Sequence, residues 1–533
     1  MASPSPTQHR ATEQPEPRGP AGPAGIPRAT PRRAPNRWVV LALLGVAQLM
    51  VTLDVTIVQI ALPSAQRALG FSTDSRQWII TAYALAFGTL LLFGGKLGDL
   101  FGRKWTLIAG LGGFAIASAI GGFAQSFAML VAARALQGVF GALLAPSALG
   151  LLTITFAGSP DRPKAFGIFS AIAASGATVG LLLGGALTQA LSWRWSLYVN
   201  LLIAIPEALL AWRLLANQPH PQRPRLDLPG VLLGSGGLFA LVYGFSNAET
   251  HSWGATATIV ALAASALALV SFIAVERRAA SPLVPIHIPW NRARGGAYLS
   301  VLLSFSAVFS VFLFLTFFMQ QSLGFSPLKT GVAFLPMTAA IAITATFVQT
   351  RVLPRTGAKP LVLLGMALGL AGTALLTRLS PHASYGGNVL PSLILVGLGM
   401  GSVFAPSIGT ATLGVQPHEA GIASALLNTS QQVGGSVGTA LLSTIFASAA
   451  ASFAAAHPHL AGLATAAQVH GEATAFWWSA GIFALGVLVA AFVLPTPPGW
   501  WRPRRQAIAA PNAAPCPPGA EGKTCGGLAA SGT

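Results

Sequence analysis

The feature that most limits the fold of this chain is a series of apolar runs, each about 20 residues long and able to cross a bilayer as a helix. Hydrophobic residues make up 53% of the chain and charged residues only 8%, whereas a soluble domain carries about 25% charged residues. The runs predict an all-α integral membrane protein with fourteen transmembrane helices. Their approximate limits are 38–62, 77–97, 105–125, 127–150, 165–190, 196–215, 228–247, 255–275, 296–319, 329–350, 359–379, 388–411, 420–447 and 474–495.

The formal net charge of +18 indicates topology rather than a nucleic-acid partner. When both termini are placed in the cytoplasm, most of the 31 Lys and Arg residues fall in cytoplasmic segments, as the positive-inside rule requires. Arg outnumbers Lys, and Ala, Gly and Pro are abundant, which is typical of a GC-rich bacterial genome. We therefore expect a multi-pass protein of a bacterial plasma membrane with both termini cytoplasmic.

The two ends of the chain differ from its apolar middle. Residues 1–37 are rich in Pro and Arg and lack the apolar core of a signal peptide, and residues 496–533 are similarly polar. Both ends are predicted to be disordered cytoplasmic tails. The only two cysteines, Cys516 and Cys525, lie in the second tail and are expected to be free thiols; a metal or regulatory role is the less favoured alternative.

An internal repeat divides the apolar region. Residues 141–147 read GALLAPS and residues 401–407 read GSVFAPS, and a Gly-x3-Gly pair at 176 and 180 recurs at 434 and 438. The nearly equal offsets indicate a duplicated half, an arrangement known in transporters, where the substrate site lies between the halves. We predict six-helix halves over 38–215 and 291–495, with a central helix pair and its loops over 216–290.

Three ionisable residues within the apolar runs are candidates for proton coupling. Asp54 lies in the first run, where a carboxylate costs a few kcal/mol and is usually kept for function. Arg134 in the fourth run is predicted to lie on a small-residue face at a similar depth. We hypothesise that Asp54 carries the proton and that Arg134 controls how readily Asp54 binds it; the alternative is a static ion pair that fixes packing. Glu207 in the sixth run is a second proton or substrate carboxylate, or a group that only bonds a neighbour or reaches toward the cytoplasm.

Six further acids are not expected to act at mid-membrane depth, because they fall at span ends or in loops. These residues are Asp99, Asp227, Glu249, Glu276, Glu419 and Glu472.

The connection between the second and third runs is short, glycine-rich and charged. It resembles the signature loop of the major facilitator superfamily, G-x-L-x-D-x-x-G-R-K, and departs from many members at Leu100, where they carry a basic residue. The matching residues are Gly95, Leu97, Asp99, Gly102, Arg103 and Lys104. The resemblance implies that this cluster latches the two halves in the outward-facing state; a plain cytoplasmic basic loop is the alternative.

Further segments resemble the fourteen-span drug:proton antiporters of that superfamily. Residues 53–63 are similar to L-D-x-T-I-V-N-x-A-L-P, with Gln59 in place of asparagine, and residues 193–200 and 325–331 also look like segments of that branch. Residues 134–142 look like R-x-x-Q-G-x-x-x-A, which is associated with proton coupling. The fifth run resembles the exporter motif G-x-x-x-G-P-x-x-G-G at Gly176, Gly180, Gly184 and Gly185, with Leu181 in place of proline; ordinary close helix packing is the alternative.

A polar stripe in the thirteenth run suggests where cargo binds. Its residues fall within about one third of the helix circumference and carry neutral side chains, which suit uncharged or amphipathic cargo; hydrogen bonding between helices is the alternative. The candidate lining residues are Ser424, Asn428, Gln431 and Gln432 in this stripe, with Gln59, Tyr83, Gln137 and Asn200 elsewhere.

These observations predict a proton-coupled secondary exporter of hydrophobic or amphipathic compounds, working by alternating access within the major facilitator superfamily fold. The partners implied are a small-molecule substrate, protons and the lipid bilayer, with no nucleic acid and no obligate protein partner. The proton gradient is the energy source, and no cofactor, metal site or enzymatic activity is predicted. A dedicated exporter or importer of one endogenous metabolite is the alternative, followed by a receptor or channel.

Overall fold

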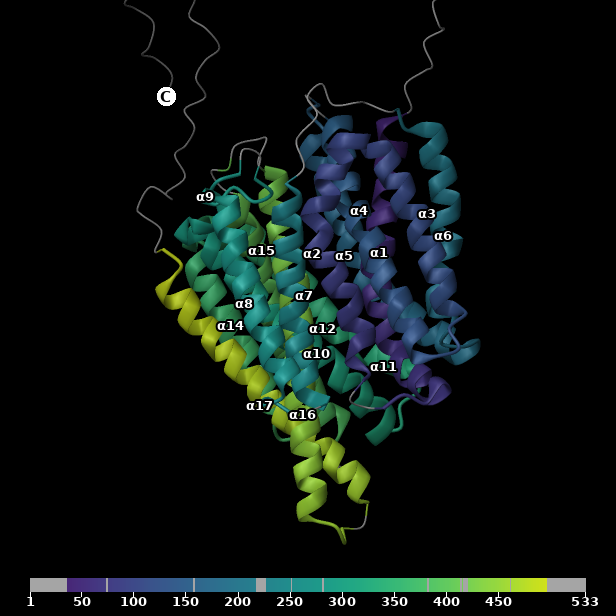
Figure 1. Cartoon of the computed structure of the whole chain (residues 1–533), viewed down its shortest axis with the longest axis vertical. Helices are drawn as coiled ribbons and strands as arrows, with labels where there is room; N and C mark the ends of the chain where they lie inside the picture. Colours follow the sequence, from purple (N-terminus) through teal and green to yellow (C-terminus); the bar gives the residue numbers. More distant parts are fainter. Residues whose placement is uncertain are drawn as a thin grey trace, which may run out of the picture.

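The computed structural model describes residues 36–495, with gaps at 73–74, 157–158, 217–226, 251, 280–281, 381–382, 413–414, 416–419 and 461. The two predicted tails lie almost entirely outside the described residues. Within the described part every regular element is a helix. The helices run side by side along the vertical axis of Figure 1, as expected for a membrane bundle.

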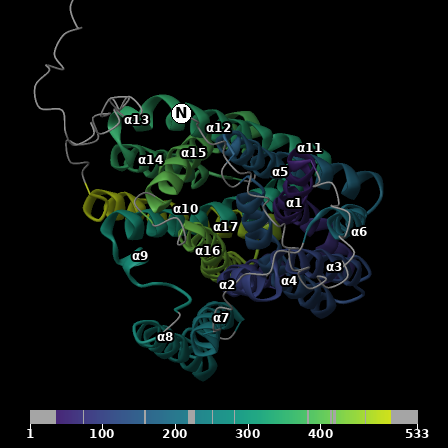
Figure 2. The same cartoon turned by 90° about the horizontal axis from the view of Figure 1, so that it is seen from above.

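Six helices form the first half of the molecule, which we call the N-half. They are α1 (Arg37–Leu69), α2 (Gln77–Phe101), α3 (Arg103–Gly122), α4 (Phe127–Thr155), α5 (Arg162–Ala190) and α6 (Trp195–Leu214). A helix pair follows, α7 (Leu228–Thr250) and α8 (Thr256–Glu276). The pair lies at the periphery, where α7 packs on α2 and α16 and α8 packs mainly on α7 (Figure 2).

The second half, the C-half, contains longer and more irregular helices. Its elements are α9 (His287–Trp290), α10 (Arg292–Phe317), η1 (Phe318–Ser322), α11 (Pro327–Ala333), α12 (Leu335–Phe347), η2 (Val348–Val352), α13 (Leu353–Thr356), α14 (Ala358–Leu376), η3 (Tyr385–Val389), α15 (Leu390–Thr412), α16 (Ala420–Ala456) and α17 (Leu463–Phe492). The η segments are π-helical turns, a form often found at functional positions.

Helix packing shows the internal repeat directly. In the N-half α1 packs on α5, α2 on α4, and α3 on both α4 and α6. In the C-half α10 packs on α16, α12 on α15, and α14 on both α15 and α17. The proline-containing segments 141–147 and 401–407 occupy α4 and α15, which are equivalent in this scheme. The predicted fold class is confirmed, while the exact domain limits stay a prediction.

The predicted count of fourteen spans is matched only in part. Twelve helical stretches among the described residues are long and apolar enough to cross a membrane. The other two predicted spans correspond to α2 and α5, which are helical but do not meet that measure over their described residues. Parts of both helices lie outside the described residues, so the count of fourteen remains a prediction.

The last two helices extend beyond the predicted limits. The span 420–447 lies within α16, and the span 474–495 overlaps α17, which begins eleven residues earlier and ends at Phe492. The end of α16 and the start of α17 form a hairpin that projects from the bundle at the bottom of Figure 1. Alanine, the strongest helix former, fills the extensions, so the helices do not stop where the apolar runs do. Glu472, expected at a span end or in a loop, lies inside the added turns of α17 and is fully buried, while the absence of a mid-membrane role stays a prediction.

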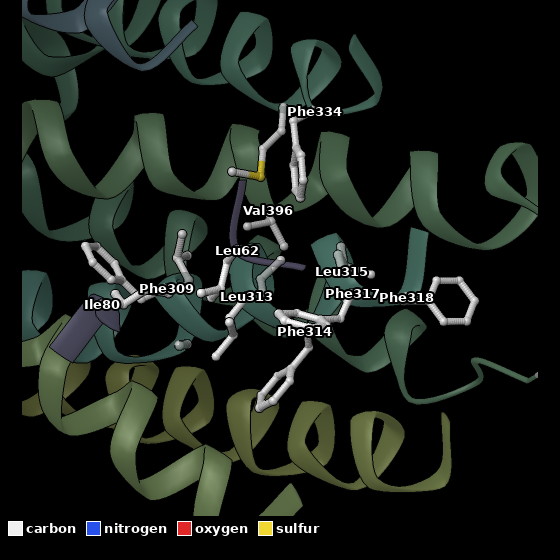
Figure 3. Close-up of a cluster of buried hydrophobic side chains, with 14 of the residues drawn as sticks. Leu62, Ile80, Phe309, Leu313, Phe314, Leu315, Phe317, Phe318, Phe334 and Val396 are labelled. Atoms are coloured by element: carbon white, nitrogen blue, oxygen red, sulfur yellow. The ribbon is translucent and has the colours of Figure 1, made fainter. Parts of the chain in front are cut away.

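One apolar cluster joins the two halves. It includes Leu62 of α1 and Ile80 of α2 together with phenylalanines of α10 such as Phe309 and Phe314, and Figure 3 shows these side chains gathered at the junction. In a soluble protein, the burial of apolar area is the main favourable contribution to folding. Between helices in a lipid bilayer, apolar contacts stabilise the packing chiefly through van der Waals interactions. The halves therefore meet on a close-packed apolar surface.

Glycines on α5 bring that helix against α1. A Cβ added at Gly176 would lie 2.9 Å from Thr52 Cβ, and one at Gly184 would lie 2.9 Å from the Ile57 carbonyl oxygen. A Cβ at Gly180 would collide with Thr56 Oγ1 and lie 2.8 Å from the Leu53 carbonyl oxygen. The glycines of the predicted exporter motif thus provide ordinary small-residue packing against α1, beside the turn that contains Asp54.

We expect Gly180→Leu to lower the stability of the folded bundle by about 1–3 kcal/mol, because the new side chain must separate α5 from α1. The measurement is thermal unfolding of the detergent-purified protein. Gly167→Leu on the same helix is the matched control, since an added Cβ there meets no described atom within 4 Å. Equal stability of the two variants would contradict close packing at Gly180.

Candidate functional site

A buried polar cluster occupies the core of the N-half, with Asp54 at its centre. Asp54 is 0% exposed and Arg134 is 2% exposed. Arg134 Nη1 donates to Asp54 Oδ2 at 2.5 Å, an ion pair between α4 and α1. The sequence placed both residues at a similar depth, and the structure brings them into direct contact.

Two amide side chains complete the coordination of the carboxylate. Asn200 Nδ2 of α6 donates to Asp54 Oδ1 at 2.7 Å, and Gln137 Nε2 of α4 donates to the same oxygen at 3.1 Å. Both amides are 0% exposed. Gln137 also accepts from Arg134 Nη1 at 2.8 Å and donates to Ser118 Oγ of α3 at 2.7 Å. The Asp54 carboxylate therefore links α1 to α4 and α6 directly, and to α3 through Gln137.

Arg134 is held on its other side by α2. Its Nε donates to the Ile79 carbonyl oxygen at 3.2 Å, and its Cζ lies 4.4 Å from the centre of the Tyr83 ring. Gly138 permits this approach, because an added Cβ there would lie 2.8 Å from Ala86 Cβ. A guanidinium on an aromatic face gains a cation–π contact that is strongest away from water.

Sequence reasoning missed Ser118 and the Ile79 carbonyl as members of this cluster. Ser118 lies among Gly and Ala on α3, where one serine gives no distinctive signal. The Ile79 carbonyl is a backbone group in the first turn of α2, and only the packing of α2 against α4 shows its role. Tyr83, Gln137 and Asn200, predicted as cargo-lining residues, surround the ion pair, and their contact with cargo stays a prediction.

Glu207 lies in the same half but outside this cluster. It is 3% exposed on α6, and the Ala47 backbone of α1 lies beside its carboxyl group. Neither carboxyl oxygen makes a well-formed hydrogen bond to a described residue. Ala47 precedes Asp54 by two helical turns, so the two acids are separated by about 10 Å along α1.

The signature loop packs mainly against the N-half, and Lys96 Nζ also donates to the carbonyl oxygen of Pro282, between α8 and α9, at 2.9 Å. Gly102, with φ 92°, turns the chain from α2 into α3. The Arg103 guanidinium covers Gly150 of α4, where an added Cβ would lie 2.6 Å from Cζ. Lys104 Nζ donates to the Trp212 carbonyl oxygen at the end of α6, at 2.8 Å.

Two further residues of the loop complete its description. A Cβ on Gly95 would contact Pro146 of α4 at 3.6 Å. The Asp99 side chain lies outside the described part of the structure. The described contacts hold the loop against α4 and α6, and its role as a latch stays a prediction.

The polar stripe of α16 faces two environments. Ser424, Asn428 and Gln431 are half-buried, and Gln431 Nε2 donates to Asn428 Oδ1 at 3.3 Å. Gln432 is buried against Gly88 of α2. The stripe thus serves helix packing at Gln432 and leaves neutral polar groups partly accessible elsewhere. Gln59 on α1 is buried, and its amide oxygen accepts no hydrogen bond from a described residue.

The fold and the buried ionic cluster define a polytopic membrane transporter built from two repeated helical halves. The Major Facilitator Superfamily model matches residues 44–439, so the chain belongs to that superfamily. It is a transporter and not an enzyme.

Three relatives show which branch the chain resembles. It is 47% identical to the puromycin resistance protein of Streptomyces alboniger, over 86% of this chain and 91% of that protein. It is 39% identical to a cephamycin export protein of Amycolatopsis lactamdurans, over 86% and 94%. It is 36% identical to the tetracenomycin C resistance and export protein of Streptomyces glaucescens, over 80% and 79%.

Solved structures confirm the fold. A bacterial homologue of the human lysosomal transporter Spinster, inward-facing and unoccupied, matches with a TM-score of 0.60 at 15% identity, over 86% of this chain and 98% of that one. The nucleoside transporter NupG matches with a TM-score of 0.59 at 13% identity, over 86% and 100%. At these identities the likeness concerns the fold alone.

Proposed function

We propose that this transporter exports hydrophobic or amphipathic organic compounds, of the kind that includes antibiotics, in exchange for protons. The single observation that carries the proposal is the buried Asp54–Arg134 pair, tied to four helices of one half. Relatives whose names state antibiotic resistance or export support the direction and class of cargo. The proton gradient would be the energy source.

Protonation of Asp54 is the chemical event that would drive the cycle. An ionised Asp54 accepts hydrogen bonds from Arg134, Gln137 and Asn200, which join α1 to α4 and α6. A proton on the carboxyl group removes its negative charge and converts one acceptor oxygen to a donor. The positive charge of Arg134 then loses its compensation inside the bundle. The helices of the N-half would rearrange in response, and release of the proton would restore the pair.

The cargo would bind between the halves, where neutral polar groups remain partly accessible. Asn428 and Gln431 of α16 present amides that can donate and accept without a net charge. Apolar side chains of the junction, such as Leu62 and Phe309, supply the surface that an organic compound needs. This combination favours uncharged or amphipathic compounds over small ions.

The test is efflux of a fluorescent lipophilic cation from cells that express the chain, with and without a proton uncoupler. We expect efflux that stops when the uncoupler collapses the gradient. Inverted membrane vesicles should also accumulate the dye when a pH gradient alone is imposed. Transport of the dye that is indifferent to the gradient would contradict proton exchange.

A narrower cargo range is the second candidate function, because each of the relatives named above carries the name of one antibiotic. A panel of structurally unrelated antibiotics separates the two candidates. Raised resistance to several of them supports broad export. Resistance to one compound, with no efflux of the fluorescent cation, supports a dedicated exporter.

We expect Glu207→Gln to reduce export while leaving thermal stability nearly unchanged. Glutamine preserves the shape of the side chain and removes only the exchangeable proton, and no ion pair is broken. Initial export rates and unfolding temperature, measured on the same preparations, check this prediction. Export at the wild-type rate would restrict proton coupling to the Asp54 cluster.

A further inference from the structure

Arg76 of the N-half is inserted into the C-half. It directly precedes α2, at the end of the bundle that the charge pattern places outside the cell, and is only 1% exposed. Its Cζ lies 4.0 Å from the ring centre of Phe317 and 5.6 Å from that of Phe314, both in α10. The ring centre of Phe446 in α16 is 4.7 Å away. We call Phe314, Phe317 and Phe446 the aromatic box.

The aromatic box is a preformed site and not a loose set of rings. Phe314 stacks on Phe446 with ring centres 5.3 Å apart and planes inclined by 22°. Phe314 also meets the edge of Phe476 in α17, with centres 6.0 Å apart. Three helices of the C-half thus fix the rings that face the guanidinium, and a cation over such faces is attracted by their quadrupoles.

A buried carboxyl group of the C-half accompanies the box. Glu472 is 0% exposed and lies one turn before Phe476 on α17. Gln468 Nε2 donates to Glu472 Oε1 at 3.0 Å, and the positive charge of Arg76 acts on the same carboxyl group. An aromatic box with an acceptor carboxyl group beside it is a combination that recognises guanidinium groups.

The surrounding contacts show that the halves are closed at this end. Gln320 Nε2 in η1 donates to the Ile60 carbonyl oxygen of α1 at 3.0 Å. A Cβ added to Gly185 of α5 would lie 2.6 Å from Leu328 Cα of α11. Alternating access rocks one half against the other, so contacts between the halves at this end must separate when it opens.

We propose that Arg76 is a gating residue of the transport cycle. Its guanidinium binds in the cation site formed by the aromatic box and Glu472, which holds the outer end closed, and it leaves that site when the outer end opens. The proposal goes beyond proton exchange and cargo class, and assigns these residues a positioning role. It also implies that the empty site accepts a free guanidinium compound.

Accessibility labelling tests this directly in the full-length protein. In a background of Cys516→Ser and Cys525→Ser, which removes the two native thiols, Leu62→Cys places a thiol at the closed junction, where Leu62 is 1% exposed. A membrane-impermeant maleimide added outside the cells reports opening of that end. The readout needs neither cargo nor a proton gradient, so it is independent of the proposed function.

We expect Arg76→Ala to raise the labelling rate about tenfold, as loss of roughly 1.4 kcal/mol of closing free energy would do. Arg67→Ala is the matched control, because Arg67 is exposed at the same end and its guanidinium donates to Ser64 Oγ of its own helix at 3.3 Å. Millimolar ethylguanidinium should lower the labelling rate of Arg76→Ala. It should have no effect once Glu472→Gln is added.

Three results would overturn the proposal. One is a wild-type labelling rate in an Arg76→Ala protein that reaches the membrane. Another is an effect of ethylguanidinium that persists in the Glu472→Gln background. If the Arg76→Ala protein does not accumulate in the membrane, the Arg76→Lys variant replaces it in the experiment. We expect the Arg76→Lys variant to be labelled faster than wild type, because an ammonium group lacks the planar face that stacks on the rings. Labelling of Arg76→Lys at the wild-type rate is the third contrary result.

Discussion

Replacing Asp54 with asparagine is expected to reduce gradient-driven export to the level that remains in the presence of a proton uncoupler. Asparagine keeps the size of the side chain and one acceptor oxygen for Asn200 or Gln137. It cannot bind and release a proton, so the exchange loses its coupling step. Export of a fluorescent lipophilic cation, with and without the uncoupler, measures the effect.

The matched control is Asp161→Asn. Asp161 also pairs with an arginine, Arg37, at 2.7 Å, but the two side chains are 36% and 44% exposed. An exposed ion pair contributes little to stability and lies outside the buried cluster. Export should survive this change. Export that survives Asp54→Asn but still stops with the uncoupler would move the proton site to another acid, Glu207 first.

Replacing Arg134 with methionine is expected to destabilise the protein by about 3–5 kcal/mol, because removal of one partner leaves a buried carboxylate without its counter-charge. Asp54 would keep only the neutral donors Gln137 and Asn200. Lower accumulation in the membrane and a lower unfolding temperature in detergent are the measurements.

The double variant Asp54→Asn with Arg134→Met separates structure from function. It contains no buried charge in the cluster, so we expect accumulation and thermal stability to recover toward wild-type values. Export should remain absent, since no group at the site exchanges a proton. Recovery of both stability and export would mean that the pair only fixes packing.

The sequence was sufficient to predict the helices and the contact at the centre of the N-half. Asp54 and Arg134 stand in apolar runs, and their distances from the run ends placed them at a similar depth. Helical periodicity put Gln137 on the same face as Arg134. The depth of a residue and the helix face on which it lies depend only on its position along one helix, which can be read from the sequence.

Contacts between helices were harder to predict. Asn200 reaches Asp54 from α6 and Ser118 reaches Gln137 from α3, and no spacing along the chain encodes those approaches. No pattern in the sequence singled out Arg76, and Glu472 was placed at a span end or in a loop because it precedes the last apolar run. Their burial depends on how α2 meets α10 and α16, and on the added turns at the start of α17.

The helix α7 joins the two halves along one side of the bundle. Ser235 Oγ of α7 donates to the Thr89 carbonyl oxygen of α2 at 3.3 Å, and Thr444 Oγ1 of α16 donates to the Phe245 carbonyl oxygen of α7 at 3.1 Å. Val242 packs between Leu85 and Ala440 in the same seam. Helix α7 therefore covers the seam where α2 faces α16. Along the opposite seam α5 packs directly on α11 and α12, so the molecule has a front and a back with respect to the bilayer.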